Sequence, residues 1–201
     1  MKLLHRADLF GWSTFDPSRN IDFHSVLFKR PGGNVAIDPL PLTEQDAAHL
    51  EALGGVRLIV ITNSDHVRAA AALAERTGAR VAGPRAEREQ FPVHCDEWLG
   101  EGDEPVGAGL RVFEMHGSKT PGELALFLDG SVLVFGDLVR AHQGGRLNLL
   151  PDAKLKDKAS AKASVARLAE LEGTEAVLVG DGWPVFSDGK RALEELVLEL
   201  R

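Results

Sequence analysis

The chain has 201 residues, a formal net charge of -7 and 44% hydrophobic residues. This length and this apolar fraction fit one domain with a buried core, so we expect a single domain over residues 1–201. The acidic balance excludes a general nucleic-acid binder, because no basic excess exists to neutralise phosphates. No apolar run approaches the roughly 20 residues that a membrane helix needs, so we expect no membrane partner.

The amino-terminal segment and the cysteine content bear on the compartment. Residues 1–8 hold no apolar run long enough for a signal peptide. Cys95 is the single cysteine, so an internal disulfide and a cysteine-rich zinc module are both excluded. We therefore expect a cytoplasmic protein.

The first half of the chain predicts strands that alternate with helices. Residues 25–30 and 35–38 indicate two strands of an early hairpin, joined by a turn that contains Pro31 and two glycines. A helix over 41–53 leads to a continuous β-branched run over 57–62, which is typical of a strand covered on both faces. Two further elements complete the unit: a helix over 66–77 and a strand over 80–83. This succession indicates an α/β unit with parallel strands.

The second half begins with short strands separated by glycine turns. We expect strands over 110–114, 124–128 and 132–135, the last two linked tightly by Asp129-Gly130. The remaining predicted elements are a helix over 160–172, a buried strand over 176–179 and an amphipathic helix over 190–200.

Three predicted strands end in polar turns. These turns are Thr62-Asn63-Ser64-Asp65-His66, Gly136-Asp137 and Gly180-Asp181-Gly182. In layered α/β folds, ligand sites form where strand ends open into loops, so the three carboxylates could converge on one cation. The competing interpretation is that each aspartate only caps a turn or a helix.

The order of these segments resembles the metallo-β-lactamase superfamily over nearly the whole chain. The similar segments are Asn34 to Asp38 (an early strand ending in aspartate), Thr62 to Glu75 (the THxHxDH loop and its helix), Lys119-Thr120-Pro121-Gly122 (the HTPG motif), Gly136-Asp137 (the bridging aspartate) and Gly180-Asp181-Gly182 (the late GHG motif). The resemblance implies an α/β fold of the four-layer αββα sandwich type.

The first metal-binding motif can be aligned in two ways. Aligned on the helix that follows, Asp65 and His66 match the Asp-His pair of the family, and Asn63 stands for a histidine. Aligned on Thr62, Asn63 and Asp65 replace two histidines, and Arg68 falls on the last one. We favour the helix alignment, since the segment that follows then needs no gap.

The other motifs also depart from the family. Lys119 stands where the resemblance implies a histidine of the first metal, and Asp181 replaces the last histidine. The resemblance then implies a metal site of Asp65, His66, Asp137 and Asp181. A protonated lysine has no lone pair, so Lys119 cannot bind a metal and argues against a dinuclear centre.

Two interpretations of the site stay open. In the first, one divalent metal is bound, zinc before iron or manganese, since carboxylates and one imidazole suit these ions. In the second, no metal is bound, and the ammonium group of Lys119 pairs with Asp137 or Asp181.

The two interpretations predict different functions. The first predicts a metal-dependent hydrolase whose metal activates water for attack on a small ester-, thioester- or amide-like substrate, with Lys119, Asn63 and Asp137 in the reaction. The alternative is a catalytically inactive, metal-free member of the fold that binds a small molecule or a protein. The residues expected to contact a substrate are Arg68, Trp183 and His116. The aromatic segment with Phe10, Trp12 and Phe15, and the apolar C-terminal helix, could serve a homodimer.

Overall fold

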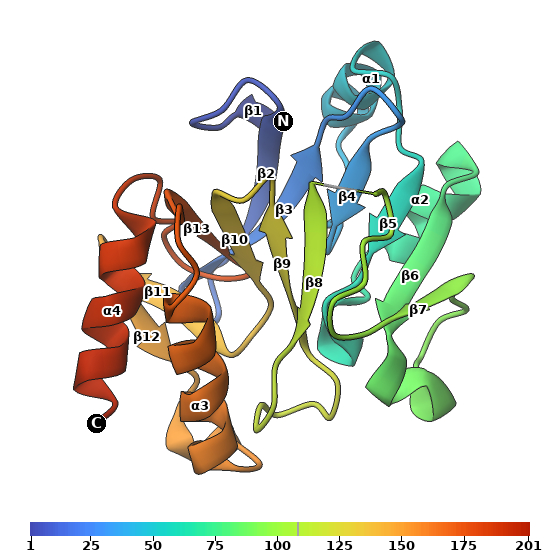
Figure 1. Ribbon diagram of the computed structural model, residues 1–201. Coiled ribbons are helices and arrows are strands. Elements are labelled where there is room, and N and C mark those ends of the chain that lie inside the picture. Colours follow the sequence, from blue (N-terminus) through green and yellow to red (C-terminus); the bar gives the residue numbers. More distant parts are fainter. Residues whose placement is uncertain (108) are drawn as a thin grey trace.

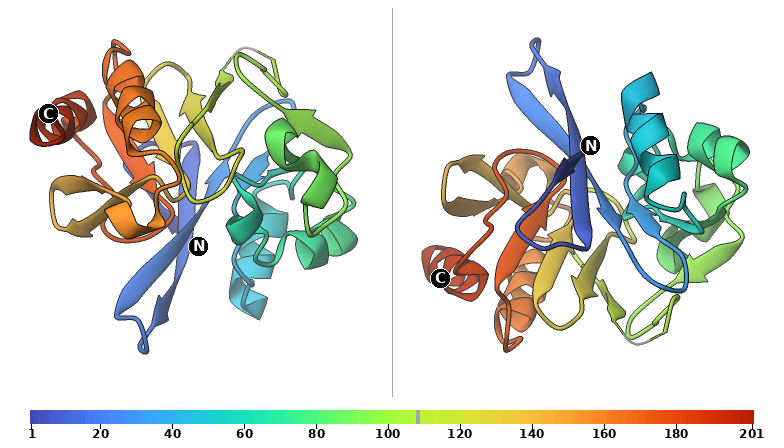
Figure 2. Two further views of the ribbon diagram at one scale, coloured as in Figure 1. Left: turned by 90° about the horizontal axis from the view of Figure 1, so that it is seen from below. Right: turned by 90° about the horizontal axis from the view of Figure 1, so that it is seen from above.

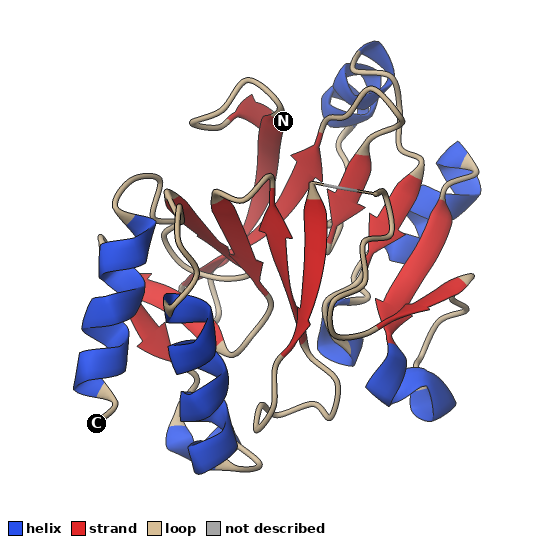
Figure 3. Cartoon of the chain, viewed as in Figure 1, coloured by secondary structure: helices blue, strands red, loops and turns tan. Residues whose placement is uncertain are grey.

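The computed structural model, which describes residues 1–107 and 109–201, contains two β-sheets packed face to face with helices on both outer sides (Figure 1). Helices α1 (Glu44–Ala52) and α2 (Ala70–Thr77) flank the first sheet, and α3 (Lys158–Ala169) and α4 (Gly189–Glu199) flank the second (Figure 3). This arrangement is the αββα sandwich that the sequence predicted.

The first sheet has seven strands in sequence order, and the second has the order β13-β10-β9-β8. The strands of the first sheet are β1 (Lys2–Leu3), β2 (Leu9–Asp16), β3 (Ile21–Phe28), β4 (Val35–Ile37), β5 (Leu58–Val60), β6 (Arg80–Pro84) and β7 (Glu97–Leu99). Those of the second are β8 (Leu110–Glu114), β9 (Leu124–Leu128), β10 (Val132–Phe135) and β13 (Ala176–Val179). The smaller elements are the pair β11 (Val139–Gln143) and β12 (Arg146–Leu149), and the 3-10 helices η1 (Ser64–His66), η2 (Arg85–Gln90) and η3 (Asp152–Lys154).

Strand pairing follows the sequence-based expectations. β3 and β4 form the antiparallel hairpin, and β4, β5 and β6 are parallel neighbours. Asp129 and Gly130 both have positive φ, +46° and +65°, which suits the tight turn of three residues between Leu128 of β9 and Val132 of β10. β13 returns parallel to β10.

Period-2 alternation in the strands builds three hydrophobic layers. In β5, Leu58 and Val60 face the space between the sheets, whereas Ile59 packs toward α1 and α2. In β10, Val132 and Val134 face the same inter-sheet core, whereas Leu133 and Phe135 pack under α3 and α4. Each sheet is therefore buried on both faces in its central strands, which explains the continuous apolar runs in the sequence.

Three features differ from the sequence-based expectations. β1, β2, β7 and the pair β11–β12 are strands that the sequence analysis did not predict. Phe10 and Trp12 of β2 are each only 8% exposed and belong to the core under α1, so they are not available to a dimer interface. The helix expected from residue 66 begins at Ala70, because η1 and the left-handed Arg68 (φ +39°) precede it.

The strands β2 and β3 extend beyond the body of the sandwich as a long hairpin (Figure 2). In the part of the chain that the structure describes, no helix has the length and apolarity needed to cross a bilayer.

Candidate functional site

Four strand ends meet at one edge of the sandwich. The parallel register of β4 with β5 aligns Asp38 with the segment that begins at Thr62, and the register of β10 with β13 aligns Asp137 with Asp181. A cavity of about 390 Å³ opens at this edge. Its lining residues are Arg19, Phe23, Leu40, Asp65, His66, Arg68, Lys119, Asp137 and Arg140.

The ammonium group of Lys119 lies between two carboxylates. Its Nζ is 2.7 Å from Asp65 Oδ2 and 2.9 Å from Asp137 Oδ2. Burial lowers the pKa of Lys119, but hydrogen bonding to Asp65 and the charge of Asp137 outweigh it and raise the pKa above its ordinary value. Lys119 is therefore a fixed positive charge at neutral pH.

Arg140 supplies a second cation, and its side chain is buried. Its Nη2 is 3.0 Å from Asp137 Oδ1 and its Nη1 is 3.2 Å from Asp181 Oδ2, while its Nε donates to the backbone carbonyl of Asp137. The Arg140 side chain is only 5% exposed. His142 Nε2 also lies 3.3 Å from Asp181 Oδ2. The guanidinium group thus links the carboxylates that follow β10 and β13.

Both nitrogens of the His66 ring face carboxylates. Nδ1 is 2.8 Å from Asp38 Oδ2, and Nε2 is 3.5 Å from Asp137 Oδ2. Asp38 is held by the backbone N–H and the hydroxyl of Thr62, at 2.7 and 2.6 Å. Burial lowers the pKa of His66, but Asp38 and Asp137 outweigh it and raise the pKa to about 9. His66 is therefore an imidazolium at neutral pH and offers no lone pair.

Arg68 connects the two sheets beneath the cavity. Its Nη1 donates to the carbonyls of His24 (2.5 Å) and Asp38 (3.0 Å), and its Nη2 donates to the carbonyl of Gly180 (3.1 Å). Arg68 and Asp38 both have left-handed backbones, with φ of +39° and +47°. Such conformations in non-glycine residues cost on the order of 1–3 kcal/mol and concentrate at functional sites.

Glu123 fixes the two loops that carry Asp137 and Lys119. Its Oε1 accepts the N–H groups of Asp137 (2.8 Å) and Leu138 (2.7 Å), and its Oε2 accepts the hydroxyl of Ser118 (2.5 Å). Full burial and the neighbouring charge of Asp137 raise the pKa of Glu123 to about 7. This carboxylate holds the backbone of Asp137 directly and, through the hydroxyl of Ser118, the loop that carries Lys119.

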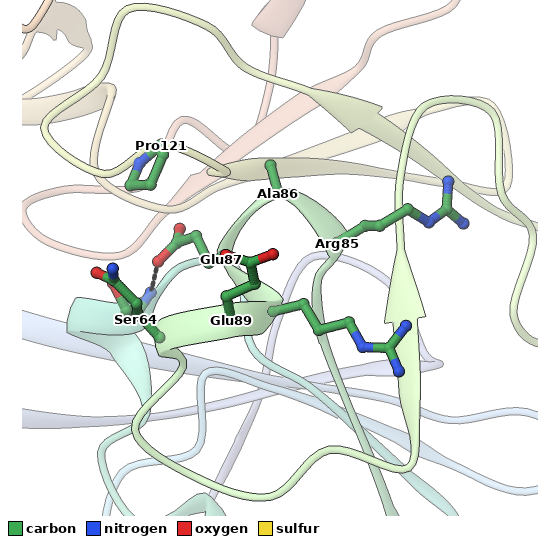
Figure 4. A pocket seen from close by; sticks show the side chains of 8 residues that line it. Ser64, Arg85, Ala86, Glu87, Glu89 and Pro121 are labelled. Atoms are coloured by element: carbon green, nitrogen blue, oxygen red, sulfur yellow. Dashed lines mark hydrogen bonds between the residues drawn. The ribbon is translucent and has the colours of Figure 1, made fainter.

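A second cavity of about 400 Å³ adjoins the first at η1. Figure 4 shows the carboxylate of Glu87 directed at the backbone of Ser64, whose N–H donates to Glu87 Oε2 at 3.1 Å, with Pro121 on the opposite wall. Glu87 thus anchors the short helix that carries Asp65.

The donors of the site do not fit a divalent metal ion. Asp137 faces Lys119, Arg140 and His66, and Asp181 faces Arg140. A metal needs several deprotonated ligands with free lone pairs, whereas both oxygens of Asp137 and Oδ2 of Asp181 already face protonated cations. Within the described part of the chain, Asp181 Oδ1 is buried without a hydrogen-bond partner, but one such oxygen does not make a set of ligands. Among residues 1–107 and 109–201, no three histidine, cysteine, aspartate or glutamate side chains are grouped as a metal ion requires.

The structure brings together five of the predicted site residues and separates the others. Asp65, His66, Arg68, Lys119 and Asp137 line one cavity. Four predicted residues do not line this cavity. Asp181 is buried and pairs with Arg140, and Asn63 is buried with its Oδ1 accepting the N–H of Asp65. His116 is exposed and its backbone N–H donates to Ser164 of α3, and Trp183 is 64% exposed.

Sequence reasoning missed four residues of this site. Arg140 carried a signal, since a basic residue stands inside the apolar run from Leu138 to Ala141. Asp38 was recognised only as the end of a strand, and Glu123 followed a recognised motif without being singled out. Arg19 carried no signal, because it lies on an exposed turn that reaches the cavity only through the β2–β3 hairpin.

Comparisons with known proteins agree with this architecture. The family model described as metallo-beta-lactamase superfamily matches residues 1–200. A metallo-beta-lactamase from Pontibacter korlensis superposes with a TM-score of 0.76 at 19% identity, covering 97% of this chain and 95% of that one. A metallo-beta-lactamase family protein from Thermus thermophilus gives 0.70 at 21% identity, covering 96% and 79%.

The metallo-beta-lactamase FIM-1 from Pseudomonas aeruginosa, in its mono-zinc form, gives a TM-score of 0.71 at 15% identity, covering 96% of this chain and 89% of that one. No curated protein matches the chain. At these identities the structures show the fold alone, whereas the family model spans almost every residue. The chain therefore belongs to the metallo-beta-lactamase superfamily.

Proposed function

We propose that this protein is a metal-independent member of its family that binds a small anionic molecule in the cavity between the strand ends. The observation that carries the proposal is the lining of the cavity. It contains four basic side chains, Arg19, Arg68, Lys119 and Arg140, and two carboxylates, Asp65 and Asp137. The protonated ring of His66 adds positive charge. An anion is the complementary ligand for such a lining.

The partly buried Lys119 and the buried Arg140 support binding without a metal. Lys119 and Arg140 neutralise Asp137 and Asp181, which would otherwise be uncompensated buried charges. The positive charge that the cavity presents beyond these pairs comes from Arg19 and from Arg68, whose guanidinium group donates to backbone carbonyls. A ligand that meets it finds preorganised donors and needs no ion to be loaded first.

The cavity also has an apolar wall. Phe23 and Leu40 line it, and the guanidinium groups of Arg19 and Arg68 lie 5.1 and 5.7 Å from the centre of the Phe23 ring. Cations over an aromatic face are held in place by that face. The wall favours an organic anion with an apolar part over a bare inorganic ion.

The proposal is tested by titrating the protein with benzoate at constant ionic strength and following the thermal unfolding midpoint. We expect the midpoint to rise in wild-type protein, and the rise to shrink in Arg19→Met, because that exposed side chain can be lost without disturbing the buried network. The Lys154→Met variant removes an exposed positive charge away from the cavity and is the matched control. An identical response in all three proteins contradicts binding at this cavity.

Metal-dependent hydrolysis of a small ester, thioester or amide is the second candidate. It is favoured by family membership and by the convergence of Asp65, His66 and Asp137, three residues of the metal set implied by the sequence. It requires that zinc, iron or manganese displace Lys119 and remove the proton from His66. A rise of the unfolding midpoint with added zinc that is lost in Asp137→Ala supports this candidate against the first.

A further inference from the structure

We infer that Asp65 occupies the place of a ligand carboxylate and is displaced when a monocarboxylate binds to Lys119. The inference rests on the proposed anion-binding function and names the class of ligand. It starts from the unequal burial of the two carboxylates on Lys119. The side chain of Asp65 is 52% exposed, whereas that of Asp137 is 4% exposed.

Asp137 cannot leave Lys119. Its other oxygen pairs with Arg140 at 3.0 Å, its backbone N–H is held by Glu123, and His66 lies 3.5 Å from the oxygen that faces Lys119. Removing this carboxylate would leave buried cations without a partner, which is strongly unfavourable. One partner of the ammonium group is therefore permanent.

The side chain of Asp65 is tied down far less. Among residues 1–107 and 109–201, its carboxylate makes one ion pair, at 2.7 Å from Lys119 Nζ. Its backbone N–H donates to Asn63 Oδ1 at 2.9 Å. Glu87 holds the backbone of the preceding residue, Ser64. The helix η1 can thus stay in place while the Asp65 side chain rotates into solvent.

The replacement of the Asp65 carboxylate by a ligand favours a ligand with a single negative charge. A monoanionic carboxylate that replaces Asp65 leaves Lys119 with two anionic partners, as before. A dianionic phosphate would add one more negative charge beside Asp137 and would be less favourable there. Phe23 and Leu40 line the same cavity as Lys119 and offer apolar surface to a small hydrocarbon group attached to the carboxylate.

The experiment is an NMR titration of the full chain with benzoate, acetate and phosphate at one ionic strength, following the backbone amides of Asp65 and Lys119. We expect the order benzoate, acetate, phosphate from strongest to weakest. Removing the internal competitor in Asp65→Asn and Asp65→Ala should strengthen benzoate binding roughly threefold to fivefold, the range expected for a half-exposed ion pair. Alanine is included because asparagine can still accept a bond from Lys119.

The Glu75→Gln variant is the matched control, since it removes the same charge from an exposed position on α2. It should bind benzoate as the wild type does. Equal benzoate affinity in wild type and both Asp65 variants overturns the displacement and leaves the proposed function standing. Tighter binding of phosphate than of benzoate overturns the monocarboxylate class. Absence of binding by every anion to every variant overturns the proposed function itself.

Discussion

At the scale of single residues, the site is an ion-pair network in which Arg140 and the protonated His66 are almost fully enclosed. Arg140 bridges Asp137 and Asp181 with a side chain that is 5% exposed. A network of this kind contributes little net stability over an apolar core, but it becomes costly as soon as one partner is removed. A substitution that removes one partner of this network should therefore lower the free energy of unfolding more than the same substitution in a surface ion pair.

Replacing Arg140 with methionine should lower the free energy of unfolding by about 3–5 kcal/mol, because Asp181 loses its buried counter-charge and Asp137 loses one of its three cationic partners. Arg146→Met is the matched control on the neighbouring strand, where the arginine pairs with Glu199 on the surface and is 59% exposed. The control should lower stability by less than about 1 kcal/mol. Urea unfolding measures both values, and equal small losses would show that the Arg140 pairs are not buried in solution.

His66 predicts a pH dependence of stability. Its pKa is raised in the folded protein from 6.5 to about 9, so its stabilising contribution is complete below pH 6.5 and is lost as the pH rises through 9. Between about pH 7.5 and 9.5, wild-type stability should fall by about 2 kcal/mol from this group. Urea unfolding at several pH values tests this, with His66→Gln as comparison. A decline equally steep in the variant would assign the effect to another residue.

Site residues could be predicted from the sequence where neighbouring residues in the chain indicated their position. Asp65, His66 and Asp137 follow predicted strands directly, so the common edge of the sheets could be inferred, and all three line the cavity. Arg140 could not be assigned, because its role depends on the distance to Asp181, far along the chain. Asn63 illustrates the opposite case, since its position in the motif suggested chemistry whereas its side chain caps η1.

At the scale of elements, the loop between β8 and β9 positions Lys119 by docking onto the start of α3. The Gly117 carbonyl accepts the N–H groups of Lys156 and Asp157, at 3.1 and 3.3 Å. Gly117 has φ +80°, and a Cβ there would lie 2.1 Å from the carbonyl oxygen of Asp157. Only glycine allows this close approach between two backbones.

Gly117→Ala should therefore lower the free energy of unfolding by more than about 2 kcal/mol, through steric overlap and an unfavourable φ. Gly144→Ala is the control, because a Cβ at that glycine meets no atom within 4 Å. Thermal unfolding compares the two variants. If both variants unfold at the wild-type temperature, the docking of this loop onto α3 is wrong.

Elements could be predicted when their own residues carried the pattern. The buried runs of β5, β10 and β13 were predicted because apolar side chains serve both faces of a covered strand. β2 was missed because Gly11 and polar residues interrupt its apolar pattern, and its stability comes from pairing along its full length with β3. The start of α2 was misplaced because the left-handed Arg68 is stabilised by three carbonyls from other elements.

At the scale of the whole molecule, the sandwich brings the ends of two sheets to one cavity and leaves other faces to solvent. Phe10 and Trp12 are part of the core, so only Phe15, at 52% exposure, remains of the aromatic segment that suggested a dimer. The homodimer stays a prediction, and sedimentation equilibrium of Phe15→Ser against wild type tests it. If wild type and variant are both monomers, the aromatic segment is not a dimer interface.

The proposed function depends on one feature of the site. The protonated side chains of Lys119, Arg140 and His66 pair with the carboxylates that a metal ion would need as ligands. The most direct measurement is the zinc content of the 201-residue chain, expressed with added zinc and purified without chelator. We expect less than about a tenth of an equivalent per chain, because Lys119, Arg140 and protonated His66 leave no free set of ligands. One tightly bound equivalent that is lost in Asp137→Ala, with the fold intact, would contradict the account.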